Sequence, residues 1–451
     1  MKKIMFLYHI KAREYEILNI IEKQIKEYDN NVEIKKGAIY ASIFDTIQFM
    51  PDIIVSIPPR DYYGSNYLTL LKIITGAVII SMTTEGNVDN TPEMVRDMIG
   101  YNTYARELVD YYIMWGPEAR NAQGKVLLND NKLTNIKRVK VTGYVFYELD
   151  KLEEIYKKNI MYKSINEFIG SREKNILVVT GFTLADLSIR QLHMMGFFGH
   201  DATAPLNEIS DYEISQAEQF IMAEKEYREK YIDIIISLAQ ENPNTGIIVK
   251  LHPSEINAKE KYYNSLMEYP NILLIKDAVP VGIMLKSVDC LIHYGSTCNM
   301  EAYIYKVPSI QLYDGRNFLK SSFHPKSDST YLVHIDDRHT LIDIMNEGTA
   351  YRSLKSLEQT LYNRFNWKSD KEYRPVEKIA YYISNAKKAQ RLRYGDKEVI
   401  NAIKSPQGRQ VINMILNDLI ENIDSFSKTY SNICALIKIY IYVLFSKLIQ
   451  V

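Results

Sequence analysis

The sequence is poor in cysteine and has no excess of charge of either sign. Only three cysteines, Cys290, Cys298 and Cys434, occur among 451 residues. An odd number without CxxC spacing argues against a disulfide framework and a structural zinc site, and it fits a reducing, cytoplasmic compartment. The 55 Lys and Arg balance 55 Asp and Glu. This balance disfavours a nucleic-acid partner, because phosphate neutralisation needs clustered positive charge.

Several familiar catalytic motifs are missing as well. The sequence has no GxxxxGK[ST], HExxH, GxSxG or GxGxxG. Phosphate-loop kinases, zincins, α/β-hydrolases and dinucleotide oxidoreductases therefore lose their main sequence support. No acidic cluster of the DxD kind is conspicuous, so we expect neither a metal nor another cofactor. The apolar stretch after Lys2 and Lys3 is about five residues long, shorter than a signal peptide requires, which again predicts a cytosolic protein.

What the sequence does contain is a regular alternation of short apolar runs with helical patterns. Repeated strand and helix alternation predicts α/β domains built on parallel, doubly wound sheets. We expect one Rossmann-like domain over residues 1–160, a second over 173–345, and a helical C-terminal extension over 377–451. The predicted strands lie at 2–8, 52–57, 77–82, 111–115, 138–142, 175–181, 246–251, 271–275, 289–293, 307–312 and 331–335.

The final apolar segment, Ile433–Val451, has two interpretations. Lys438 and Lys447 interrupt it, and it falls short of the roughly 20 apolar residues that span a bilayer. It can be a terminal helix packed on its own protein. Alternatively, together with the basic stretch 387–393, it can form a peripheral contact with the inner face of an anionic membrane.

Two strand ends in the second half carry polar residues suited to phosphate binding. His252 and Pro253 follow the run IIVKL, and Ser296 and Thr297 follow DCLIH just before a predicted helix that contains Glu301. Ligands of open α/β sheets bind at the carboxyl ends of strands, and a helix N-terminus favours anions. The alternatives are a chance His-Pro dipeptide and an ordinary helix cap.

The first half offers candidates for acid–base chemistry and for the acceptor. Glu85 follows the apolar run AVIISM and precedes Gly86, and it is our candidate general base. His9, Arg13 and Glu14 follow the first predicted strand. There they would face the same cleft between the two predicted domains as Glu85. A solvated loop glutamate and an ordinary surface helix start are the alternatives.

The order of these motifs resembles that of bacterial surface-carbohydrate biosynthesis proteins of the GT-B type. The second half resembles transferases that use CMP-activated sialic acid or Kdo, and the related polyol-phosphate transferases that use CDP-glycerol. The resemblance covers roughly residues 1–340 through short motifs. In chain order these are ARE at 12–14, TEG at 84–86, WG at 115–116, TG at 142–143, HP at 252–253, ST at 296–297, EA at 301–302 and KVP at 306–308.

The resemblance implies a role for each candidate residue. His252, Ser296 and Thr297 would hold the donor phosphate, Glu301 would hold the nucleoside, and Glu85 would act as general base. It also implies two Rossmann-like domains facing each other across a cleft, with the acceptor bound by the N-terminal domain and the nucleotide-sugar by the C-terminal one.

The expected function is a metal-independent glycosyltransferase of surface polysaccharide or glycoconjugate synthesis. It would transfer a sugar, a nonulosonic acid or Kdo, from a CMP-activated donor to a hydroxyl of a glycan or lipid-linked acceptor. Three alternatives remain: a CDP-glycerol-type polyol-phosphate transferase, a non-hydrolysing UDP-sugar epimerase, and a non-catalytic scaffold of a polysaccharide assembly complex.

Overall fold

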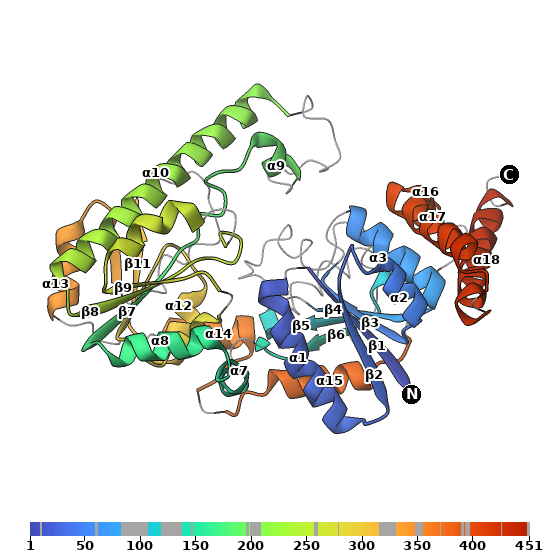
Figure 1. Cartoon of the computed structure of the whole chain (residues 1–451), viewed down its shortest axis with the longest axis horizontal. Coiled ribbons are helices and arrows are strands. Elements are labelled where there is room, and N and C mark those ends of the chain that lie inside the picture. Colours follow the sequence, from blue (N-terminus) through green and yellow to red (C-terminus); the bar gives the residue numbers. More distant parts are fainter. Residues whose placement is uncertain are drawn as a thin grey trace. The chain divides into compact units, whose positions relative to one another are not determined.

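The chain forms two compact units in the computed structural model (Figure 1). Unit 1 comprises Met1–Glu148 and Glu358–Val451, and unit 2 comprises Leu149–Leu357. The structure describes residues 1–9, 11–58, 62–82, 107–118, 138–145, 148–194, 198, 209–256, 260–277, 279–314, 331–347, 355–369, 371–388, 392, 397–424 and 426–448.

Unit 1 contains a parallel six-stranded sheet in the order β2-β1-β3-β4-β5-β6. The chain starts at β1, moves to β2 on one side and then to β3 on the other, so the switch point lies between β1 and β3. The sequence prediction missed β2, because this edge strand is only partly buried and carries three charged residues. The strands are β1 (Lys2–Tyr8), β2 (Val32–Ala38), β3 (Ile53–Ser56), β4 (Val78–Met82), β5 (Tyr111–Met114) and β6 (Val139–Val141).

Helices cover both faces of this sheet (Figure 1). One face packs against α2 (Ile43–Phe49) and α3 (Tyr62–Thr75), whose apolar side chains join those of the strands in one core. The other face is covered by α1 (Lys11–Tyr28) and α15 (Pro375–Ser384). The chain returns from unit 2 to unit 1 through α14 (Lys355–Phe365).

The expected helical C-terminal region is present and packs on α2 and α3 of unit 1. It consists of α16 (Lys397–Lys404), α17 (Pro406–Glu421) and α18 (Phe426–Leu448). In α18, Ala435 and Ile439 are part of the unit 1 core, and Lys438 Nζ donates to the carbonyl of Ile74 at 2.8 Å. This confirms that the terminal helix packs on its own protein. Among the described helices, none combines the length and apolar character needed to cross a bilayer.

Unit 2 contains a second parallel six-stranded sheet, in the order β12-β11-β10-β7-β8-β9. Numbered within the unit and read from β9, this is the 3-2-1-4-5-6 order of the Rossmann fold, with its switch point between β7 and β10. The two sheets confirm the predicted fold class, while the domain limits proposed from sequence stay predictions. The strands are β7 (Lys174–Val179), β8 (Thr245–Lys250), β9 (Ile272–Ile275), β10 (Cys290–His293), β11 (Ser309–Tyr313) and β12 (Tyr331–His334).

The long helix α10 lies along one face of this sheet, with α8 and α12 on the other (Figure 1). A capping box between Ser210 and Glu213 starts α10, and its residues Tyr231 and Leu238 enter the unit 2 core. The helices of the unit are α7 (Leu149–Tyr156), α8 (Ile160–Gly170), α9 (Ile189–Met194), α10 (Asp211–Glu241), α11 (Val281–Leu285), α12 (Cys298–Ile304), α13 (Arg338–Glu347) and the 3-10 helix η4 (Glu260–Glu268).

Candidate functional site

The predicted phosphate-binding residues of unit 2 lie at one edge of its sheet. His252 follows β8, Ser296 and Thr297 follow β10, and β7 runs between these two strands. The backbone N–H of His252 donates to Thr180 Oγ1, just after β7, at 3.0 Å. Because parallel strands share the direction of their carboxyl ends, the three loops meet beside the switch point, where ligands of this fold bind.

The His252 side chain has a defined orientation. Its Nδ1 lies 2.8 Å from Ser254 Oγ and accepts a hydrogen bond from the Ser254 N–H at 3.2 Å. An imidazole nitrogen that accepts from a backbone amide carries no proton, so the neutral ring is protonated on Nε2. His252 can therefore present an N–H donor to a phosphate oxygen.

A buried carboxylate, which the sequence analysis missed, fixes the loop that carries His252. Glu255 is 0% exposed. Its carboxylate accepts hydrogen bonds from the Thr180 hydroxyl, from the His252 N–H at 3.3 Å and from Tyr263 OH at 2.6 Å. Burial, with the Glu255 charge beside it, raises the pKa of Tyr263. The sequence signal was a glutamate three residues after His252, a spacing that allows a return bond to the loop backbone.

The turn after β10 has the tight geometry that its sequence predicts. Gly295 adopts φ +56°, a left-handed conformation that glycine takes without steric cost. The Ser296 N–H donates to Nδ1 of the buried His293 at 3.1 Å, and Ser296 Oγ accepts from the Cys298 N–H at 3.3 Å. Thr297 makes no side-chain capping bond. The ordinary capping alternative thus describes Ser296, whose hydroxyl also hydrogen-bonds the Cys298 side chain.

Two ionisable groups beside this turn have strongly shifted pKa values. Burial raises the pKa of Glu301 to about 8, although a hydrogen bond from the Gly282 N–H and the charge of Lys250 act in the opposite direction. Burial lowers the pKa of Lys250 to about 8, against the attraction of nearby acidic groups that include Glu301. Lys250 Nζ donates to the Leu251 carbonyl at 3.1 Å. Near neutral pH the pair therefore carries a net positive charge, which suits an anionic ligand.

In unit 1 the structure places part of the predicted acceptor site. His9 is exposed directly after β1, at the switch point of the first sheet. Glu14 is 1% exposed, and its carboxylate accepts a hydrogen bond from the His9 N–H at 2.6 Å. Glu14 thus anchors the loop that presents His9. Arg13 lies in α1, but its side chain, like the whole of Glu85, falls outside the part of the chain that the structure describes.

The WG and TG motifs have a packing role in unit 1. A Cβ added at Gly116 would lie 2.3 Å from the backbone carbonyl of Arg364, and one at Gly143, where φ is +110°, would lie 2.8 Å from Tyr373 OH. The Trp115 ring stacks on Phe365 with centroids 5.7 Å apart. Both glycines therefore let the returning chain, from α14 to residue 373, approach the carboxyl ends of β5 and β6.

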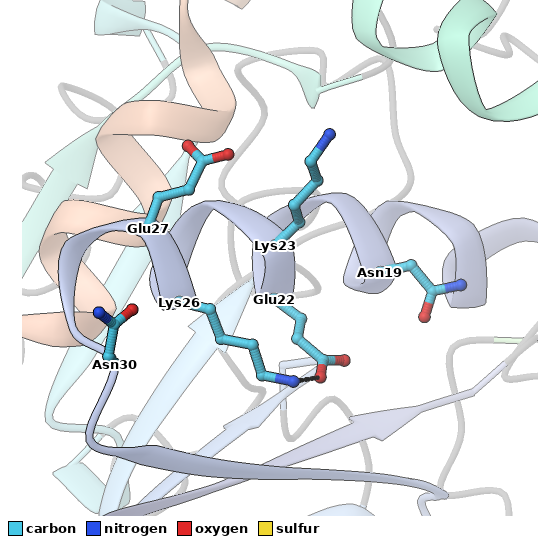
Figure 2. Close-up of a pocket in the computed structure, with 6 residues that line it drawn as sticks. All are labelled: Asn19, Glu22, Lys23, Lys26, Glu27 and Asn30. Atoms are coloured by element: carbon cyan, nitrogen blue, oxygen red, sulfur yellow. Dashed lines mark hydrogen bonds and ion pairs between the residues drawn. The ribbon is translucent and has the colours of Figure 1, made fainter.

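A shallow depression on α1 is lined by polar side chains that do not form a binding site (Figure 2). It measures about 500 Å³ and is largely open to solvent. Its central carboxylate, Glu22, is already paired with Lys26 at 2.6 Å and with Lys36. We therefore assign no ligand to it. The lining residues are Asn19, Glu22, Lys23, Lys26, Glu27 and Asn30.

Neither a protein-family model nor a curated protein sequence matches the chain.

Solved structures resemble it at low sequence identity. UDP-GlcNAc 2-epimerase from Methanocaldococcus jannaschii, in complex with UDP-GlcNAc and UDP, is 15% identical with a TM-score of 0.48, over 86% of this chain and 100% of that one. UDP-GlcNAc 2-epimerase from Neisseria meningitidis is 12% identical with a TM-score of 0.47, over 84% and 98%. The wall teichoic acid polymerase TagF is 12% identical with a TM-score of 0.46, over 85% and 88%. The fold is assigned from the strand order of the two parallel sheets.

Proposed function

We propose that the chain is a nucleotide-dependent transferase whose donor binds at the carboxyl edge of the unit 2 sheet. The observation that carries this proposal is the orientation of His252, whose Nδ1 accepts from Ser254 and whose Nε2 therefore bears a proton. Ser296 and Thr297 supply hydroxyl donors across the same edge, and Lys250 adds positive charge. Together these groups suit a phosphate bound without a metal.

The specific reaction we propose is transfer of a nonulosonic acid or Kdo from its CMP-activated form. An acceptor hydroxyl attacks the anomeric carbon, and its proton passes to the Glu85 carboxylate. The bond between the anomeric carbon and the phosphate oxygen breaks, and the electron pair leaves with CMP. His252 and the Ser296–Thr297 turn stabilise the charge that develops on the leaving phosphate, and Glu301 binds the nucleoside.

The acceptor, in this proposal, is a glycan or lipid-linked saccharide bound by unit 1. His9, Arg13 and Glu14 follow β1 at the switch point of the sheet. In the sequence, Glu85 comes three residues after the end of β4. We place the reaction in the cytoplasm, where the free thiols Cys290, Cys298 and Cys434 are stable.

We further propose a peripheral contact between α18 and the inner face of the membrane. The outward side of α18 is apolar through Ile433, Ile437, Tyr440 and Leu444, which are 41–63% exposed. Lys388 lies near Gly76 at the end of α3, beside the Lys438 contact with Ile74. Apolar surface with adjacent cations suits an anionic leaflet.

Point substitutions test this contact without removing core residues. We expect Ile437→Ser with Tyr440→Ser to lower co-sedimentation with phosphatidylglycerol vesicles at low salt. Tyr381→Ser, at a 56% exposed tyrosine on α15, should not. Equal sedimentation of all three proteins would remove the membrane assignment.

A nucleotide panel tests the transferase proposal and its alternatives. A ligand that binds the folded state raises the melting temperature by mass action, so thermal shift with CMP, CDP and UDP should show stabilisation by CMP. Product analysis then separates the reactions. CMP-sugar consumption with an acceptor supports the proposal. Glycerol-phosphate transfer from CDP-glycerol, epimerisation of UDP-GlcNAc without acceptor, or binding without turnover would each replace it with the corresponding alternative.

A further inference from the structure

Among the described residues of unit 1, several buried hydroxyls have no hydrogen-bond partner, and two of them lie in neighbouring strands. Ser56, the last residue of β3, is 2% exposed, and Ser81, in β4, is 0% exposed. The structure gives neither Ser56 Oγ nor Ser81 Oγ a partner. Burial of an unsatisfied hydroxyl is costly, so such atoms mark a place where a ligand or a water completes the structure.

The two hydroxyls lie on the same side of the sheet. Ser56 and Ser81 are register partners in neighbouring parallel strands. Side chains two residues apart in a strand share a face. Ile54 and Ile79, each two residues before one of these serines, belong to the core that also contains residues of α3. Both hydroxyls therefore project toward the face that α3 covers.

The helix that covers them begins close by. α3 has 14 residues and starts at Tyr62, six residues after the end of β3, so its N-terminus is held near the carboxyl ends of the strands. Its first turn contains no acidic residue, and Arg60 and Asp61 precede it in the sequence. The positive end of a helix dipole favours an anion and disfavours a cation, and two hydroxyl protons add donors for the same ligand.

From this arrangement we infer that unit 1 binds an oxyanion, a phosphate or carboxylate group, between Ser56, Ser81 and the first turn of α3. The site lies at the carboxyl edge of the sheet, next to the switch point between β1 and β3. On the proposed function, in which unit 2 holds the donor nucleotide, this oxyanion belongs to the acceptor. The acceptor is then an acidic or phosphorylated saccharide or polyol.

The test measures phosphate binding to the full chain by equilibrium dialysis with radiolabelled inorganic phosphate, in the presence and absence of saturating CMP. We expect one phosphate per chain that CMP does not displace. Ser56→Ala with Ser81→Ala should weaken this binding at least tenfold, because hydrogen bonds to charged groups are among the stronger ones. The control is Thr46→Val, whose buried hydroxyl donates within its own helix, to the Ser42 carbonyl at 2.6 Å.

Stability separates an oxyanion site from a site filled by water. Without phosphate, the double variant should unfold at the same urea concentration as the wild type or higher, because the hydroxyls it loses have no partner. Unchanged phosphate binding in the double variant would refute the oxyanion site, and a lower urea midpoint in that case would show that the hydroxyls hold a structural water. The site would also be refuted if the wild type bound no phosphate in the presence of CMP.

A failure of the donor assignment is a separate result. If CMP does not bind to the chain, the donor site in unit 2 is refuted, whereas weaker phosphate binding in the serine variant would still support the oxyanion site in unit 1.

Discussion

Removal of the Glu255 carboxylate should destabilise unit 2 and loosen the loop that carries His252. In Glu255→Ala, the His252 N–H and the hydroxyls of Thr180 and Tyr263 lose their common acceptor. A hydrogen bond to a charged group contributes about 1.5–3 kcal/mol, and bonds that share one acceptor are not additive. Since Tyr263 is 0% exposed, its hydroxyl stays buried without its carboxylate acceptor. We expect the free energy of unfolding to fall by about 3–5 kcal/mol.

The assay is urea denaturation followed by CMP titration at a urea-free condition where each variant is folded. Glu255→Gln is the matched substitution: its amide oxygen can accept from Thr180 and His252 while its NH₂ donates to the Tyr263 oxygen. We expect it to lose only about 1–2 kcal/mol. Glu268→Ala, at an exposed position of η4, should change stability by less than about 0.5 kcal/mol. If Glu255→Ala unfolds like the wild type and binds CMP equally well, the reasoning about this carboxylate is refuted.

Three further predictions concern charge, packing and catalysis. As pH rises through about 8, Lys250 loses its positive charge and Glu301 gains a negative one. The affinity for CMP, measured by calorimetry, should therefore fall between pH 7 and 9. A constant affinity over this range would contradict the charges assigned to these two residues. Gly116→Ala should lower the free energy of unfolding by about 1–3 kcal/mol, because the added Cβ would lie 2.3 Å from the Arg364 carbonyl. Gly170→Ala is the control and should not lower it, because no atom lies within 4 Å of a Cβ at that position. Glu85→Gln should keep CMP affinity and lose about 10²–10⁴ in transfer rate; near-normal turnover would move the general base elsewhere.

The sequence predicts most strands of the fold because their residues are buried on both sides. A parallel strand covered by helices is a continuous apolar run, as in the segment NILVV of β7. The edge strand β2 escaped prediction for the opposite reason, since its sequence VEIKKGA contains three charged residues and is only partly buried. Both sheets could therefore be located, with one strand missing.

The candidate site was predictable only where its residues follow a strand directly. His252 and Ser296 meet this condition, and the topology places both at one edge. The groups that fix the His252 loop come from distant parts of the chain: Thr180 is 75 residues from Glu255, and Tyr263 lies in the 3-10 helix η4. Which groups meet across that distance depends on strand order and register, which a single sequence does not encode in a local pattern.

The most direct test of the central claim is the affinity of the full chain for CMP when His252 is replaced by alanine. Loss of one hydrogen bond to a charged phosphate corresponds to about 10–100-fold weaker binding. The control is His339→Ala, at a side chain that is 89% exposed on α13, and it should bind CMP like the wild type. We predict that His252→Ala retains the urea midpoint of the wild type and binds CMP at least tenfold more weakly. Equal CMP affinity in a folded His252→Ala protein would contradict the assignment of the nucleotide site to unit 2.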